Sequence, residues 1–88
     1  MKNILLESKE KKSRSEIVAF LKELAEKIDS GTVTFLQGEE SLDLEIPEKL
    51  TLELEVQEKE KEHKPKKMQI EIELEWYLGE KSESIELG

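Results

Sequence analysis

The fold is decided by one stretch near the end of the chain, Met68-Gln69-Ile70-Glu71-Ile72-Glu73-Leu74-Glu75-Trp76. Apolar residues stand at its even positions and polar or acidic residues at its odd ones. Successive side chains of a β-strand point to opposite faces of the sheet. The pattern therefore predicts a strand with one apolar and one acidic face, and the alternation extends this strand to Leu78.

A second alternating stretch lies upstream, at residues 50–57, and the charged residues 59–67 separate the two. A loop of this length joins neighbouring strands as an antiparallel hairpin. Its register follows from keeping the apolar residues on one face. We expect Leu54 to face Ile72 and Val56 to face Ile70.

Two further strands are expected over residues 32–36 and 42–46, joined by a turn at Gln37-Gly38-Glu39-Glu40. The punctuation at Pro47-Glu48-Lys49 then leads into residues 50–57. Short connections between four strands predict an antiparallel meander. The expected pairs are Phe35 with Leu42, Val33 with Leu44, Ile46 with Leu50, and Leu44 with Leu52.

Residues 13–30 are the one helical segment of the pattern. Ser13 and Glu16 have the spacing of a capping box, and Gly31 is placed to end the helix. An apolar stripe runs along it at helical spacing: Ile17, Phe20, Leu21, Leu24, Ala25 and Ile28.

The expected fold class is α+β, with one helix on one face of a four- to five-stranded, mainly antiparallel sheet in the order β-α-β-β-β-β. Asn3 to Glu7 supplies the first strand of that order. Residues 79–88 contain only two apolar residues and are expected to form a loose tail.

The chain resembles the amphi-Trp domain family of small prokaryotic proteins, whose name describes an alternating stretch that ends in Trp. The likeness covers residues 3–78, which we expect to belong to a single domain spanning residues 1–78. The segments that carry it are Glu7-Ser8, Ser13-Arg14-Ser15-Glu16, Ile28-Asp29-Ser30-Gly31-Thr32-Val33, the Gly38 turn and Ile70 to Trp76. The family has no established activity, so the resemblance implies a domain boundary and no functional residues.

Composition excludes most chemistry. The 88 residues include no Cys and one His, and the formal net charge is −8. The absence of Cys excludes disulfides, thiolate nucleophiles and Cys-based metal sites. The acidic balance argues against nucleic acid, and no apolar run is long enough for a membrane span or a signal peptide. We expect a cytoplasmic, non-enzymatic protein without cofactors.

The residues that could carry chemistry have simpler interpretations. His63 lies in a charged loop with no neighbouring ligand residue, and the serines have no base to activate them. The basic segments Lys9–Arg14 and Lys59–Lys67 are interrupted by glutamates and contain a single Arg, which favours solvated loops over an anion site. Trp76 fits either the core or a protein contact.

The face of the sheet opposite the apolar residues is the most unusual feature, because it carries acids and no base. Its expected register opposes Glu53 to Glu73 and Glu55 to Glu71, which is unfavourable. We consider a docking face for a basic partner, a divalent-cation face of low affinity, and a face that serves solubility alone. The candidate partner-binding residues are Asp43, Glu45, Glu53, Glu55, Glu71, Glu73, Glu75 and Tyr77.

The apolar, helix-facing side of the sheet predicts a homodimer. One helix is about 10 Å across, whereas five strands make a sheet about 24 Å wide, so the helix leaves apolar side chains uncovered. Pairing two such faces would cover them, as would the N-terminal segment or the tail. The candidate self-association or core residues are Leu52, Leu54, Ile72, Leu74 and Trp76.

Crowding of like charges predicts how stability depends on pH and salt. Neighbouring carboxylates raise one another's pKa in the folded chain. Stability should then fall as pH rises through the range in which they ionise, and added salt should stabilise the protein at neutral pH.

Overall fold

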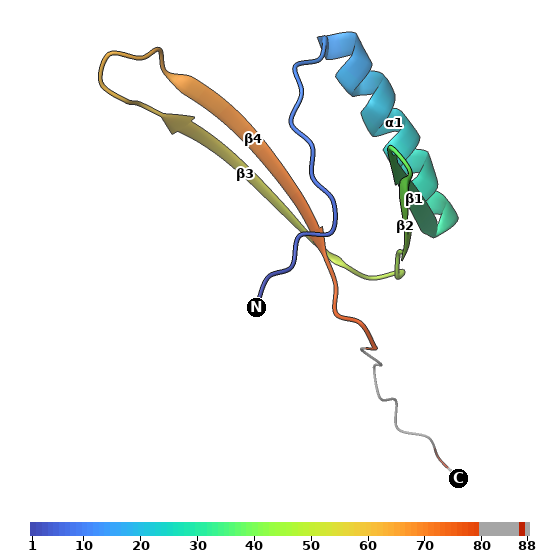
Figure 1. Cartoon of the computed structure of the whole chain (residues 1–88). Helices are drawn as coiled ribbons and strands as arrows, with labels where there is room; N and C mark the ends of the chain where they lie inside the picture. The colour runs from blue at the N-terminus through green and yellow to red at the C-terminus, as the bar shows by residue number, and fades with distance from the viewer. Residues whose placement is uncertain (80–86, 88) are drawn as a thin grey trace. The chain divides into compact units, whose positions relative to one another are not determined.

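The computed structural model describes residues 1–79 and 87 of the chain. Its elements are, in order, α1 (Arg14–Ser30), β1 (Thr32–Gln37), β2 (Glu40–Glu45), β3 (Thr51–Lys59) and β4 (Lys67–Glu75), shown in Figure 1. One helix and four antiparallel strands confirm the α+β class. The chain divides into two compact units, Met1–Glu48 and Lys49–Gly88, and each is described by itself.

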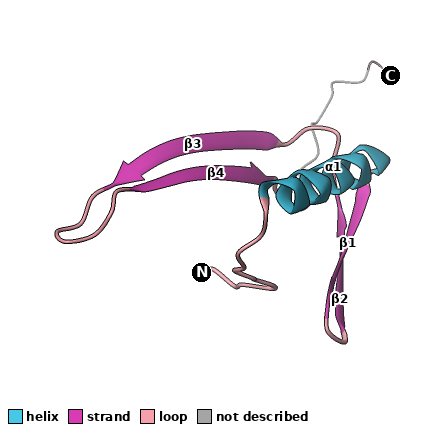
Figure 2. Ribbon diagram, turned by 90° about the horizontal axis from the view of Figure 1, so that it is seen from above, coloured by secondary structure: helices cyan, strands magenta, loops and turns pink. Residues whose placement is uncertain are grey.

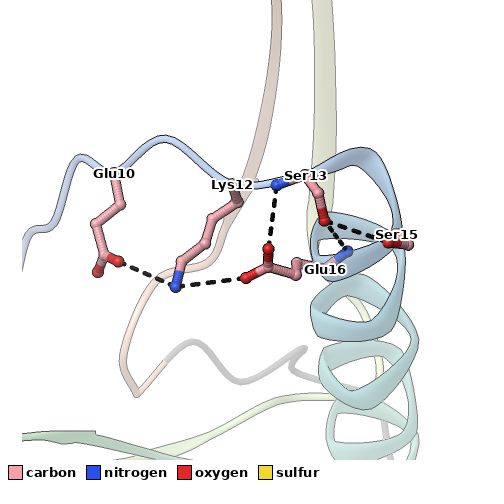
Figure 3. Close-up of polar contacts among 5 residues, drawn as sticks. All are labelled: Glu10, Lys12, Ser13, Ser15 and Glu16. Atoms are coloured by element: carbon pink, nitrogen blue, oxygen red, sulfur yellow. Dashed lines mark hydrogen bonds and ion pairs between the residues drawn. The ribbon is translucent and has the colours of Figure 1, made fainter.

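Helix α1 begins and ends where the sequence predicts. The Ser13 side chain accepts the Glu16 backbone N–H at 3.1 Å, and the Glu16 carboxylate accepts the Ser13 N–H at 3.4 Å (Figure 3). Both bonds satisfy N–H groups that have no partner inside the helix. At the other end Gly31 has φ 92°, and its N–H donates to the Ile28 carbonyl at 3.0 Å.

Strands β1 and β2 form the hairpin of the first unit. The predicted pairs Phe35–Leu42 and Val33–Leu44 are present. The turn has two central residues, of which only Gly38 has a positive φ, 61°. Glycine adopts this conformation without steric cost, and hairpin turns use it to match the twist of their strands.

The core of the first unit lies between α1 and β1, which are side by side in Figures 1 and 2. Val33 is the one fully buried apolar residue among those described, at 3% exposure. Leu24 and Ile28 of the helix are half-buried, as are Phe35 and Leu44 of the hairpin. The outer part of the predicted helix stripe, including Phe20, stays exposed.

Strands β3 and β4 form the longer hairpin of the second unit. Its nine pairs include Leu54–Ile72 and Val56–Ile70, so the predicted register is confirmed. The connecting loop contains a turn in which the Lys64 N–H donates to the Lys61 carbonyl at 3.2 Å.

The single five-stranded sheet is not formed. The four strands make two separate two-stranded sheets, so the expected pairs Ile46–Leu50 and Leu44–Leu52 are absent. The connection between β2 and β3 bends at Glu48 and Lys49, directly after Pro47. Proline has no N–H to donate to a ladder, which favours a break there over a continuous hairpin.

Both ends of the chain also differ from the prediction. Asn3 to Glu7 is not a strand: one side-chain bond, from Gln37 Nε2 to the Glu7 carbonyl at 3.0 Å, ties it to β1. Strand β4 ends at Glu75, short of the predicted Leu78, because its partner β3 begins at Thr51. Of the expected tail at residues 79–88, only Gly79 and Leu87 lie within the described residues.

Replacing Ser13 with Ala should lower the free energy of unfolding by about 0.5–2 kcal/mol, because the Glu16 N–H loses its acceptor. Urea denaturation followed by circular dichroism measures the change. Ser8→Ala, in the extended segment before the helix, is the matched control and should change little. An equal loss in both variants would show that the capping bond does not stabilise α1.

Candidate functional site

The β3–β4 hairpin presents two faces of opposite character. One is the hairpin apolar face, formed by Leu52, Leu54, Val56, Met68, Ile70, Ile72 and Leu74. The other is the hairpin acidic face, formed by Glu53, Glu55, Glu71, Glu73 and Glu75. Each cross-strand pair unites residues of one face, because the register matches odd positions with odd and even with even.

Like charges oppose one another along the hairpin acidic face. Glu53 pairs with Glu73 and Glu55 with Glu71, as predicted. The neighbouring Glu73 carboxylate raises the pKa of Glu53 above its ordinary value of 4.5. The carboxylates therefore repel one another in the folded hairpin.

The structure divides the predicted acidic surface between two sheets. Asp43 and Glu45 lie in β2, in the other unit, where the Asp43 carboxylate accepts the Thr34 hydroxyl at 2.7 Å. Tyr77 lies beyond the end of β4 and is 83% exposed. Of the predicted acidic surface, the five glutamates of the hairpin acidic face lie together in the β3–β4 sheet.

Among the described residues of the second unit, no other helix or strand packs on the hairpin apolar face. The exposure of its seven side chains runs from 39% for Leu74 to 70% for Ile70. Leu52, Leu54 and Ile72, three of the predicted self-association residues, are all more than half exposed. Trp76, which follows β4 directly, is half-buried.

The loop between β3 and β4 concentrates positive charge. Residues 59–67, called the lysine loop below, carry five lysines and two glutamates. Lys66 lies 3.1 Å from Glu60 and 3.5 Å from Glu58. The other four lysines and Pro65 surround an open hollow of about 390 Å³, and none of these lysines has an ion-pair partner among the described residues.

His63 sits at the tip of the lysine loop, in the turn between Lys61 and Lys64. Its φ of 63° is the left-handed conformation, which side chains other than glycine adopt rarely. Its side chain is exposed, as the sequence predicts for a loop residue. Its backbone conformation and exposure are those of a turn residue.

A groove in the first unit was not foreseen from the sequence. It has a volume of about 760 Å³ and runs between the N-terminal segment and the β1–β2 hairpin. Ile4, Leu5 and Leu6 line one side, and Phe20, Phe35 and Leu42 are among the residues on the other. In the sequence, the one indication of this groove is that the apolar run Ile4-Leu5-Leu6 does not alternate.

Two kinds of site were sought among the described residues. Within residues 1–79 and 87, no three His, Asp or Glu side chains are grouped closely enough to hold a metal ion. Helix α1 is too short and too polar to cross a membrane.

The comparisons with known proteins agree with the resemblance that the sequence suggests. The family model of the Amphi-Trp domain matches residues 1–88, the whole of the chain given. No curated protein and no solved structure matches it.

The raised pKa of Glu53 has a consequence for stability. A carboxyl with a higher pKa in the folded state binds more protons there than in the unfolded chain. Its contribution favours the folded state below about pH 4.5, and this advantage is lost as pH rises through the folded pKa. We expect the melting temperature to fall with pH across that range.

Glu73→Lys should remove this dependence and leave the protein equally or more stable at pH 7, because it puts a lysine opposite Glu53. Melting temperatures against pH, at low and high salt, measure both effects. Glu39→Lys, in the β1–β2 turn, makes the same charge change without an opposed carboxylate. A clearly less stable Glu73→Lys protein would contradict the repulsion.

Proposed function

The chain belongs to the Amphi-Trp domain family, and we propose that it is a non-enzymatic interaction module that self-associates through the hairpin apolar face. The observation that carries this proposal is the exposure of all seven apolar side chains on that face, between 39% and 70%. Contiguous apolar surface of this kind marks contacts with other molecules.

The area available suits a homodimer. A Leu, Ile, Val or Met side chain exposed to this degree offers on the order of 70–100 Å² of apolar surface, so the face offers roughly 500–700 Å² per copy. Two copies would bury roughly 1,000–1,400 Å², which reaches the lower part of the range of specific protein interfaces, about 1,200–2,000 Å². An interface of this size fits a dimer of moderate affinity.

The hairpin also needs cover for its own stability. A two-stranded hairpin alone is marginally stable in water, and stability requires a third strand or a packing partner. In the described part of the second unit, β3 and β4 pair only with each other. A second copy would supply the missing layer, and Trp76 beside the face is of a type enriched at interface centres.

The composition supports a role without catalysis. The single His is an exposed turn residue in a loop of lysines and glutamates, and the chain contains no Cys. The two hairpin faces are suited to binding other molecules. The divalent-cation alternative has no grouped ligand set within the described residues, so we do not develop it.

A basic protein segment on the hairpin acidic face is a second candidate. The observation that favours it is the repulsion between Glu53 and Glu73, which a row of lysine or arginine side chains would relieve. The two functions are compatible, because the apolar and acidic side chains point to opposite sides of the hairpin.

Sedimentation at high micromolar concentration should give twice the chain mass. Leu54→Glu should shift the chain to monomer, because it places a charge in the middle of the apolar contact. Gln57→Glu adds the same charge to the opposite face of the same strand and should leave the dimer intact. Leu54→Thr, which suits a strand, should weaken the dimer without unfolding the hairpin. A monomeric parent protein would overturn self-association through this face.

For the second candidate, an oligolysine peptide added to labelled protein should shift the amide signals of β3 and β4 in a saturable, salt-sensitive way. The double variant Glu53→Gln/Glu73→Gln should weaken this binding. A double variant of the other unit, Glu23→Gln/Glu26→Gln, makes the same charge change and should not. Equal weakening in both would mean that the peptide senses only net charge.

A further inference from the structure

We propose that the lysine loop is a binding site for a compact polyphosphate anion, that is, a short chain of phosphate groups such as inorganic and nucleoside triphosphates carry. The site lies within a single loop of the second unit, at the end of the β3–β4 hairpin opposite Thr51 and Glu75. It therefore does not depend on self-association through the hairpin apolar face.

The backbone holds four lysines of the loop together in two close pairs. Lys59 and Lys67 are directly opposed across the hairpin, where Cβ atoms lie about 4.5–5.5 Å apart. Lys61 and Lys64 are the first and last residues of a turn closed by the 3.2 Å bond from the Lys64 N–H to the Lys61 carbonyl. The Cα atoms at the two ends of such a turn lie within about 7 Å of each other. Each pair brings like charges together, and an anion between them would offset the cost.

The described residues that line the hollow of the loop include no carboxylate. The hollow has a volume of about 390 Å³, and its lining consists of Lys59, Lys61, Lys64, Pro65 and Lys67. Small-molecule sites in proteins have volumes of about 300–1,000 Å³. The two glutamates that interrupt the loop lie elsewhere, because Glu60 is 3.1 Å from Lys66 and Glu62 is the second residue of the turn. The sequence alone favoured a solvated loop because of these glutamates, and the structure leaves both out of the lining.

The hairpin acidic face is separated from the lysines by a neutral level of the sheet. Gln57 pairs with Gln69 between the lysine pair and the first glutamates. Glu55 is four residues from Lys59 on β3, about 13 Å along the strand. This spacing exceeds the Debye length of about 8 Å at physiological ionic strength. The glutamates of the strands therefore reduce the attraction of the loop for an anion only weakly.

The chemistry of the lining selects the class of anion. A lysine ammonium group binds phosphate as a compact point charge with three donors, so several lysines around one hollow suit an anion with several charged oxygens. The described lining contains no aromatic side chain on which a nucleobase could stack. The formal net charge of −8 also repels a long polyanion that extends beyond the loop. A short phosphate chain fits these conditions better than a nucleic acid does.

Binding can be measured on the isotope-labelled full chain. Sodium tripolyphosphate, added at low salt without divalent cations, should shift the amide signals of residues 59–67 in a saturable way. Sodium chloride at matched ionic strength is the control and should not reproduce these shifts. ATP should bind with a similar dissociation constant, because its base has no stacking partner in the described lining.

Variants test whether the lining lysines carry the binding. Lys61→Gln/Lys64→Gln should raise the dissociation constant of tripolyphosphate roughly two- to thirtyfold, because two exposed charge contacts are lost. Lys61→Arg/Lys64→Arg keeps both charges and should bind about as tightly as the parent protein. Lys22→Gln/Lys27→Gln, on α1, makes the same change in net charge as the first variant and should have little effect. Melting temperatures show that each variant is folded.

The outcomes decide between a site and general attraction. Absence of saturable shifts in residues 59–67 would overturn the proposal. Equal weakening by the loop and α1 glutamine variants would overturn it too, because the anion would then sense only net charge. A single-stranded oligothymidylate that binds the loop more tightly than tripolyphosphate would replace the compact ligand with nucleic acid. Saturable binding that the loop glutamine variant weakens and the arginine variant retains supports the site, whether the chain is a monomer or a dimer.

Discussion

The second unit depends on the pairing of β3 with β4, whose side chains alternate between apolar and polar over most of their length. Nine cross-strand pairs fix the register, and this register places every apolar residue of the hairpin on one side. Two strands have no interior of their own, so this side is covered only when another layer packs against it. The proposed dimer follows from this requirement.

Local pattern predicted local structure well. The capping residues and Gly31 place both ends of α1, and alternation gives the registers of both hairpins. Such signals suffice because each element is specified by residues close together in the sequence. The opposition of Glu53 and Glu73, and with it the raised pKa, followed from the register alone.

Relations between hairpins could not be predicted in the same way. The period-2 pattern shows which face of a strand is apolar. It does not show which other strand pairs with that strand's edge. Leu44 and Leu52 have matching patterns, yet their strands belong to separate sheets, and the bend after Pro47 intervenes. For the same reason, the predicted acidic surface combined Asp43 and Glu45 with the hairpin glutamates, although the structure places them in two separate sheets. The apolar groove beside Ile4 to Leu6 was missed because a segment without alternation gives no orientation.

The opposed glutamates have one more consequence, for the kind of assembly that the hairpin permits. Identical strands that stack in register, as in a fibril, place each residue directly beside its own copy. For β4 this would create continuous rows of Glu71, Glu73 and Glu75, and for β3 rows of Glu53 and Glu55. Repulsion would grow with every chain added, whereas the contact between two apolar faces is complete after one. The same charges that repel one another within a single hairpin would thus oppose open-ended polymerisation through the edges of β3 and β4.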